Sequence, residues 1–166
     1  KFKYNMMVKV SGPEPQRTTY DNRFSNQLTP ADYIALLVVG LPEEKNRTKV
    51  KSNVTIVSHL NAAEMQAAIS SSGIIIARSG YSTIMDLAAL GKKAVFVPTP
   101  GQTEQEYLAK LLLQKNVAYY QKQAAFDLQK ALKENEKFAG FTKRELSEEL
   151  EKRINLLLQK HHRSNL

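Results

Sequence analysis

Six short apolar runs rich in β-branched residues recur along the chain and predict six β-strands. The runs are Met6–Val10, Tyr33–Val39, Val54–Val57, Gly73–Ala77, Ala94–Val97 and Val117–Tyr120. Four of them, at 34–39, 54–57, 74–77 and 94–97, are almost continuously hydrophobic. Continuous hydrophobicity over four to eight residues is typical of strands that are covered on both faces.

Segments with helical periodicity lie between these runs. Ala62–Ser71 and Glu104–Lys115 repeat their small or apolar residues at spacings of three and four, as an amphipathic helix requires. Strands that alternate with helices predict a parallel sheet with right-handed crossovers. We therefore expect a single Rossmann-like α/β domain, with a six-stranded, mainly parallel sheet and helices on both faces.

The C-terminal segment is predicted to differ from the rest of the chain. Phe138–Gly140 has the character of a loop, and Thr142–Glu145 has the pattern of a capping box that opens a helix with one leucine-rich stripe. We expect residues 1–137 to form the α/β domain, and residues 138–166 to form a helix and tail that pack on this sheet or on an absent domain. Because the chain begins with Lys1 and enters a strand almost at once, we interpret it as part of a longer protein.

Composition excludes several classes of site. The chain has no cysteine, so disulfide scaffolds, thiolate metal sites and thiol nucleophiles are excluded. A formal net charge of +8 favours an anionic partner. The basic residues are scattered and form no tract of five or more, which argues against nucleic acid as that partner. No apolar run approaches the roughly 20 residues of a membrane-spanning helix.

The most informative loop follows the run at 74–77. Ligands of open α/β sheets bind beyond the carboxyl ends of the strands, and here the chain passes through Arg78 and Gly80 into a helix that we expect Ser82 or Thr83 to cap. Amides at the start of a helix attract anions, and these hydroxyls and Arg78 can bind phosphate oxygens. Asp86 is then placed to accept hydrogen bonds from a ribose. The alternative is that Ser82 only caps the helix and Asp86 complements its dipole.

Two further loops carry polar groups. Pro98–Glu106 offers donors and acceptors that suit the hydroxyls of a sugar, or it is simply a helix start with a capping box made by Thr103 and Glu106. In the loop Ser11–Arg17, Gly12 permits close approach of a ligand and Arg17 can reach a phosphate, unless this loop is only a proline-rich turn.

Histidines provide weaker candidates. His59 lies at a strand end, inside the expected ligand zone, and is either a general base or a packing residue. His161 and His162 lie in the tail and lack the spacing of metal ligands. We therefore predict no metal site.

The run Arg78–Asp86, the strand Ala94–Pro98 and the loop that contains Gln105 together resemble a known domain. From about Val8 to Leu132 the chain is similar to the C-terminal, donor-binding domain of GT-B glycosyltransferases. The MurG family of N-acetylglucosaminyltransferases, with its glycosyltransferase family 28 C-terminal domain, looks most similar. The same stretch resembles the signature box of plant UDP-glycosyltransferases.

The resemblance implies a UDP-sugar donor as the ligand of this domain. Ser11 and Gly12 correspond to the loop near the diphosphate and sugar, Leu60 and Met65 to the uracil contacts, and Asp86 to a ribose-binding Glu. Gln105 corresponds to a residue that reads the donor sugar, with Glu104 or Glu106 as its second polar contact. The complete candidate donor site comprises Ser11, Gly12, Arg17, Leu60, Met65, Arg78, Ser79, Gly80, Ser82, Thr83, Asp86, Glu104, Gln105 and Glu106.

The resemblance also implies a reaction: inverting, metal-independent transfer of a hexosyl or N-acetylhexosaminyl group, with UDP-sugar as substrate and no cofactor. Acceptor and catalytic base would belong to a missing N-terminal domain, so this chain is expected to contain no catalytic residue, to bind nucleotide and to turn over little. The expected place is the cytoplasm, perhaps with a lipid-linked acceptor at the inner face of a membrane. The alternatives are a UDP-sugar hydrolase, an enzyme like UDP-N-acetylglucosamine 2-epimerase, or a noncatalytic UDP-sugar-binding subunit.

Overall fold

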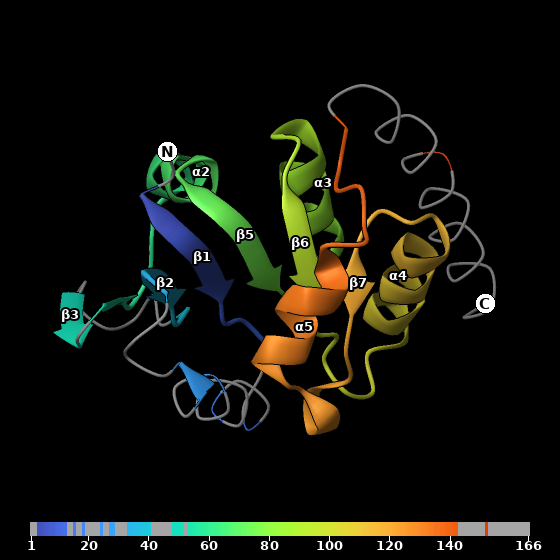
Figure 1. Ribbon diagram of the computed structural model, residues 1–166, viewed down its shortest axis with the longest axis horizontal. Coiled ribbons are helices and arrows are strands. Elements are labelled where there is room, and N and C mark those ends of the chain that lie inside the picture. The colour runs from blue at the N-terminus through green and yellow to red at the C-terminus, as the bar shows by residue number, and fades with distance from the viewer. Residues whose placement is uncertain are drawn as a thin grey trace, which may run out of the picture.

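A computed structural model describes residues 3–12, 15, 18, 24, 27–28, 33–40, 48–51, 53–142 and 152 (Figure 1). Seven strands form one sheet in the order β3-β4-β2-β1-β5-β6-β7. The strands are β1 (Tyr4–Lys9), β2 (Ala35–Val38), β3 (Thr48–Lys51), β4 (Val54–Val57), β5 (Ser72–Ala77), β6 (Lys93–Phe96) and β7 (Tyr119–Tyr120). The helices are α2 (Ala62–Ser70), α3 (Tyr81–Ala89), α4 (Thr103–Gln114), α5 (Leu128–Asn135) and the short 3-10 helix η1 (Gln123–Ala125).

All six predicted strands are present, and they pair in parallel. The seventh strand, β3, was not predicted; it pairs antiparallel with β4 at the edge of the sheet. Its sequence is Thr-Lys-Val-Lys, and Val50 is 71% exposed. An edge strand that alternates with lysine has no buried apolar run by which to recognise it. The expected Rossmann-like α/β fold is confirmed.

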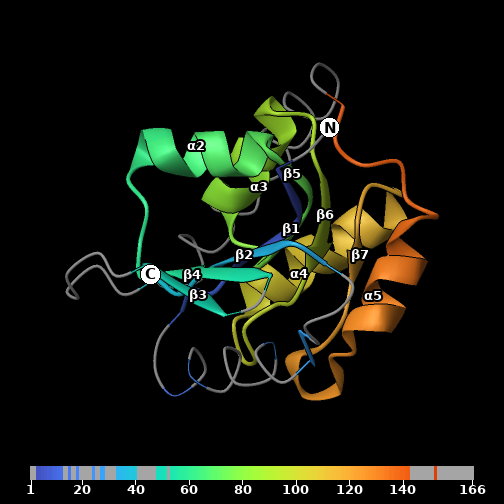
Figure 2. The ribbon, with the colours of Figure 1, turned by 60° about the vertical axis from the view of Figure 1, so that its left-hand side comes forward.

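Two hydrophobic layers cover the sheet, one on each face. Side chains of α2, α3 and α4 pack with Met7 of the central strand in one layer, whereas α5 and Phe24 pack with Met6 and Val8 in the other. Alternate residues of a strand point to opposite faces, so β1 contributes to both layers. Figure 2 shows α2 and α3 on one side of the sheet and α5 on the other.

The segment after α5 continues on the same domain as far as the structure describes it. The Phe141 ring packs edge-on against Phe96 with 6.3 Å between centroids, and the Gly140 amide donates to the Val117 carbonyl at 3.0 Å. The predicted loop at 138–140 is confirmed. The capping box at 142–145 and the helix after it lie outside the described residues, apart from Thr142 and the helical Lys152.

None of the helices in the described part of the chain is long and apolar enough to cross a membrane.

Candidate functional site

The loops singled out by the sequence converge at one edge of the sheet. The parallel strands β1, β5 and β6 are neighbours, and their carboxyl ends lead into Ser11–Gly12, Arg78–Gly80 and Val97–Gln102. Their arrowheads point to the same edge in Figure 1, where α3 and α4 begin. The edge formed by these three loops is the candidate site.

Helix α3 begins without a side-chain cap. Its N-cap is Gly80, which supplies no side-chain cap, and the first backbone bond in the helix runs from Ile84 N–H to the Gly80 carbonyl at 3.1 Å. The expected cap by Ser82 or Thr83 is wrong, because the helix starts one residue before Ser82 and both hydroxyls lie in its first turn. The amides of residues 81–83 therefore have no acceptor within the helix and present the positive end of its dipole.

The absence of a side chain at Gly80 leaves this helix start open. Its φ of −74° and ψ of 150° suit any residue, and a Cβ built there would meet no atom within 4 Å. Neither the backbone conformation nor protein packing therefore requires glycine at this position. A glycine here leaves room for a ligand to approach the amides closely.

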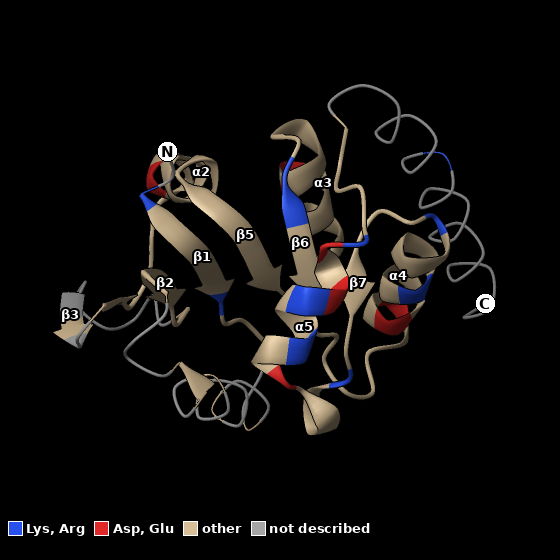
Figure 3. Ribbon diagram, viewed as in Figure 1, with Lys and Arg blue, Asp and Glu red and all other residues tan. Residues whose placement is uncertain are grey.

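Lys9, which the sequence analysis did not select, also lies at this helix start. It is the last residue of β1, half-buried, and its Nζ lies 3.5 Å from Thr83 Oγ1. Figure 3 shows that the described Lys and Arg residues are spread over several elements. A charged residue that ends an otherwise buried parallel strand was the signal that could have identified Lys9.

Arg78, which the sequence suggested as a phosphate contact, makes several hydrogen bonds within the protein. The side chain is 3% exposed, and all three guanidinium nitrogens donate to protein acceptors. The acceptors are the carbonyls of Ser11 (3.3 Å), Val97 (2.9 Å) and Pro98 (3.3 Å) and the Gln123 Oε1 (2.6 Å). The guanidinium thus holds together the loops after β1, β5 and β6.

The loop before α4 is held by a second set of hydrogen bonds. The buried Ser79 hydroxyl donates to the Gln105 carbonyl at 2.7 Å, and the Gln105 Oε1 accepts from the Thr99 amide at 2.9 Å. The N-cap of α4 is Gln102 and has no side-chain cap, so the alternative capping box of Thr103 and Glu106 does not form. Ser79 and Gln105 therefore shape the loop, in addition to any contact with a ligand.

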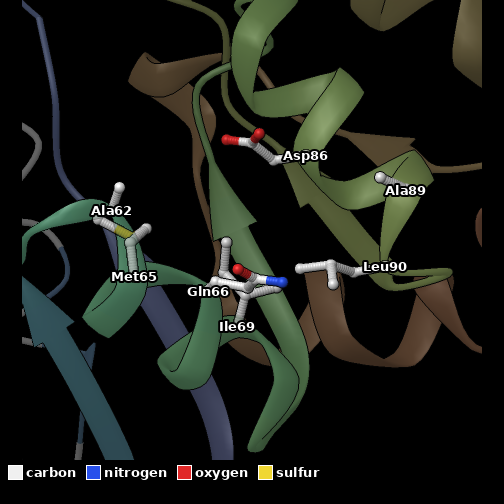
Figure 4. A pocket seen from close by; sticks show the side chains of 7 residues that line it. All are labelled: Ala62, Met65, Gln66, Ile69, Asp86, Ala89 and Leu90. Atoms are coloured by element: carbon white, nitrogen blue, oxygen red, sulfur yellow. The ribbon is translucent and has the colours of Figure 1, made fainter.

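A pocket of about 340 Å³ lies between α2 and α3 (Figure 4). Its lining is apolar except for Asp86 and Gln66, and Figure 4 shows Asp86 projecting from α3 toward the α2 side. The start of α2 is fixed by a capping box in which Asn61 and Glu64 exchange hydrogen bonds of 2.9 Å. The structure thus brings together Met65 and Asp86, the residues predicted for base and ribose.

The other described residues of the predicted donor site do not line the pocket between α2 and α3. Leu60 is half-buried against the core but does not line this pocket. Glu104 is exposed on α4, and Glu106 lines a different pocket with Pro98 and Tyr120. Arg17 lies outside the described residues.

Gly12 and Thr99 face each other across the strand ends. Gly12 has a φ of +121°, and a Cβ on it would lie 3.6 Å from Thr99 Oγ1. Thr99 is 2% exposed, and its hydroxyl has no hydrogen-bond partner among the described residues.

Histidine and acidic side chains do not add a metal centre here. His59 is half-buried, and its Nδ1 lies 3.4 Å from the Ser58 hydroxyl. Within the described ranges, no group of three or more His, Asp or Glu side chains is placed to hold a metal ion.

A mainly parallel sheet with helices on both faces defines a Rossmann-like α/β domain. The sequence profile of the glycosyltransferase family 28 C-terminal domain matches residues 22–163. The chain therefore belongs to this family.

Individual relatives agree with this assignment. A UDP-N-acetylglucosamine–N-acetylmuramyl-(pentapeptide) pyrophosphoryl-undecaprenol N-acetylglucosamine transferase from Rhodopseudomonas palustris is 29% identical over 90 residues, which cover 50% of this chain and 24% of that protein. Acinetobacter baumannii MurG superposes with a TM-score of 0.58 at 20% identity, covering 79% of this chain and 42% of that chain. The solution structure of ALG13 gives a TM-score of 0.61 at 9% identity, covering 92% and 95%. The two structural likenesses concern the fold alone.

Proposed function

We propose that this domain binds the UDP-sugar donor of a glycosyltransferase. The observation that carries the proposal is that α3 has an uncapped start at Gly80 and, further along, carries Asp86, which lines the pocket together with Met65 of α2. An apolar pocket with a few polar groups suits a base and ribose, and a helix start suits a diphosphate. The relative from Rhodopseudomonas palustris carries UDP-N-acetylglucosamine in its name.

In the proposed arrangement, the uracil lies against Met65 and Leu60, and the Asp86 carboxylate accepts hydrogen bonds from the ribose. The diphosphate lies at the amides of residues 81–83 and the exposed Ser82 hydroxyl. The sugar extends toward the loop that Gln105 holds, near Gly12 and Glu104.

The proposed reaction is direct displacement at the anomeric carbon with inversion. Negative charge develops on the leaving diphosphate, and oriented amides stabilise it without rearranging. We propose that no metal or cofactor takes part, that the transferred group is a hexosyl or N-acetylhexosaminyl group, and that acceptor and base come from another domain. This chain alone is then expected to bind donor and to show little or no transfer.

The acceptor is proposed to be lipid-linked and bound at the cytoplasmic face of a membrane. Support comes from the Rhodopseudomonas relative, whose name gives N-acetylmuramyl-(pentapeptide) pyrophosphoryl-undecaprenol as the acceptor. The chain spans about a quarter of that relative's length, so the acceptor site would lie in the remaining part of such a protein.

Calorimetry with UDP, ADP and GDP tests the donor proposal. We expect UDP to bind measurably more tightly than the two purine diphosphates, because the relative from Rhodopseudomonas palustris is named for a UDP-linked donor. UDP-N-acetylglucosamine and UDP-glucose then report the sugar preference. Equally weak heats for UDP, ADP and GDP would contradict the proposal.

Asp86→Ala is expected to weaken UDP binding by roughly tenfold or more, because a hydrogen bond to a charged group contributes about 1.5–3 kcal/mol. Binding of 2′-deoxy-UDP should change less, since one of the ribose hydroxyls is already absent. Glu136→Gln, at the end of α5 on the other face of the sheet, is the control for loss of one negative charge. If the variant retains the wild-type preference for UDP over 2′-deoxy-UDP, Asp86 does not contact the 2′-hydroxyl.

A further inference from the structure

We infer that Lys9 supplies the positive charge that binds the diphosphate. The inference rests on the proposed function and deepens it by naming a residue that the sequence had not indicated. A diphosphate carries a charge that amides alone balance only in part, and a charge-assisted hydrogen bond is stronger than a neutral one. Arg78, the cation that the sequence placed here, is buried and donates from all three nitrogens to protein acceptors.

Lys9 reaches the start of α3 from the neighbouring strand. β1 pairs directly with β5 in parallel, with Val8 opposite Ile76, so Lys9 lies beside the residues that lead into the Arg78–Gly80 turn. Its Nζ lies 3.5 Å from Thr83 Oγ1, and Thr83 is the third residue of α3. An ammonium has three donors, so the one long contact to Thr83 leaves others for a phosphate oxygen.

Lys9 has no competing charge partner in the part of the chain that the structure describes. Within the described residues, none of the carboxylates forms an ion pair with it, and its contact to Thr83 is its side-chain hydrogen bond. The residue is half-buried at a strand end, where solvent screens a charge less than on an open surface. A cation in this position raises the positive potential that the helix start already provides.

Thr99 gives a second, independent observation on the opposite flank of β5. The strand order is β1-β5-β6, so Lys9, which ends β1, and the loop Val97–Gln102, which follows β6 and contains Thr99, lie on either side of the β5 turn. The Thr99 hydroxyl is buried beside Gly12 and has no partner among the described residues. A buried donor without an acceptor costs free energy, and a phosphate oxygen over this turn would satisfy it.

Lys9→Met tests the inference on the 166-residue chain. The variant keeps the length and apolar character of the stem and removes only the charge. We expect UDP affinity to fall roughly tenfold to a hundredfold, as loss of one charge-assisted hydrogen bond implies, with uridine affinity unchanged within about twofold. Lys9→Arg, which keeps the charge, should retain most of the UDP affinity. Lys130→Met on the exposed side of α5 is the control for the same change in net charge.

The outcomes separate the inference from the proposed function. If wild-type protein binds UDP no better than uridine, the proposed function is wrong. If wild type prefers UDP and Lys9→Met retains that preference, the inference is wrong and the proposed function stands. If Lys9→Met weakens uridine and UDP equally, Lys9 only positions α3 through Thr83, which also overturns the inference. Should Lys9→Met not fold, Lys9→Gln is judged by the same ratio of UDP to uridine affinity.

Discussion

Replacing Arg78 with alanine is expected to lower the free energy of unfolding by about 3–4 kcal/mol. The change leaves the buried carbonyls of Val97 and Pro98 without their donor and removes the tie to Gln123. Each buried acceptor that loses its partner costs about 1–3 kcal/mol. Urea unfolding followed by circular dichroism should show a lower midpoint with an unchanged slope.

Two variants identify the cause of that loss. Arg78→Lys keeps the charge but not the planar fork, so it should satisfy fewer of the carbonyls and give an intermediate stability. Lys130→Ala on the exposed side of α5 should change stability by less than about 0.5 kcal/mol. If Arg78→Ala were as stable as wild type and had lost only UDP affinity, the result would support the phosphate contact that the sequence suggested for Arg78.

The strands were predictable because most of them are covered on both faces. β2 is buried at all four positions, and β6 at its last three, which produces the continuous apolar runs that the sequence displays. β3 escaped prediction because it has one neighbour and alternates Val50 with lysines. A strand that is buried on both faces has a continuous apolar run in the sequence, whereas an exposed edge strand has none.

The site was predictable in position and less so in detail. Parallel topology alone places the residues after β1, β5 and β6 at one edge, and the sequence identified those loops. It did not show that the Arg78 side chain points inward to the carbonyls of Val97 and Pro98. An arginine at this position could equally point outward to a ligand, and the sequence is the same in both cases. The sequence did not indicate Lys9 either. From the sequence alone Lys9 is one residue of a strand, and only the register of β1 against β5 places it beside the turn that follows β5.

The first residues of α3 and α4 also differ from the sequence-based prediction. Ser82 and Thr83 have the composition of N-caps, yet the cap of α3 is Gly80, so the hydroxyls lie within the first turn. The same occurs at α4, where Gln102 rather than Thr103 is the cap. At neither helix does the cap side chain accept a hydrogen bond from a helix amide, and both helix starts face the loops of the candidate site. At α2, by contrast, Asn61 and Glu64 form a complete capping box.

Gly80→Ser is expected to stabilise the fold and to weaken UDP binding. Serine is a preferred N-cap whose hydroxyl accepts from the second or third amide of the helix, and the φ of −74° at Gly80 accommodates it without strain. Capping and the lower entropy of the unfolded chain together predict a gain of about 0.5–1 kcal/mol in the free energy of unfolding. The same hydroxyl occupies amides proposed for the diphosphate, so UDP affinity should fall roughly tenfold or more.

Gly80→Ala distinguishes occupation of the amides from simple crowding. The alanine methyl enters the same open space, where a Cβ meets no atom within 4 Å, but it accepts no hydrogen bond. A larger loss of UDP affinity with serine than with alanine would show that the amides themselves bind the ligand, whereas equal losses would indicate a steric effect. Uridine affinity should be nearly unchanged in both, because the α2–α3 pocket does not include residue 80. Wild-type UDP affinity in Gly80→Ser, with the predicted gain in stability, would mean that the diphosphate binds elsewhere and that α3 was left uncapped for another reason.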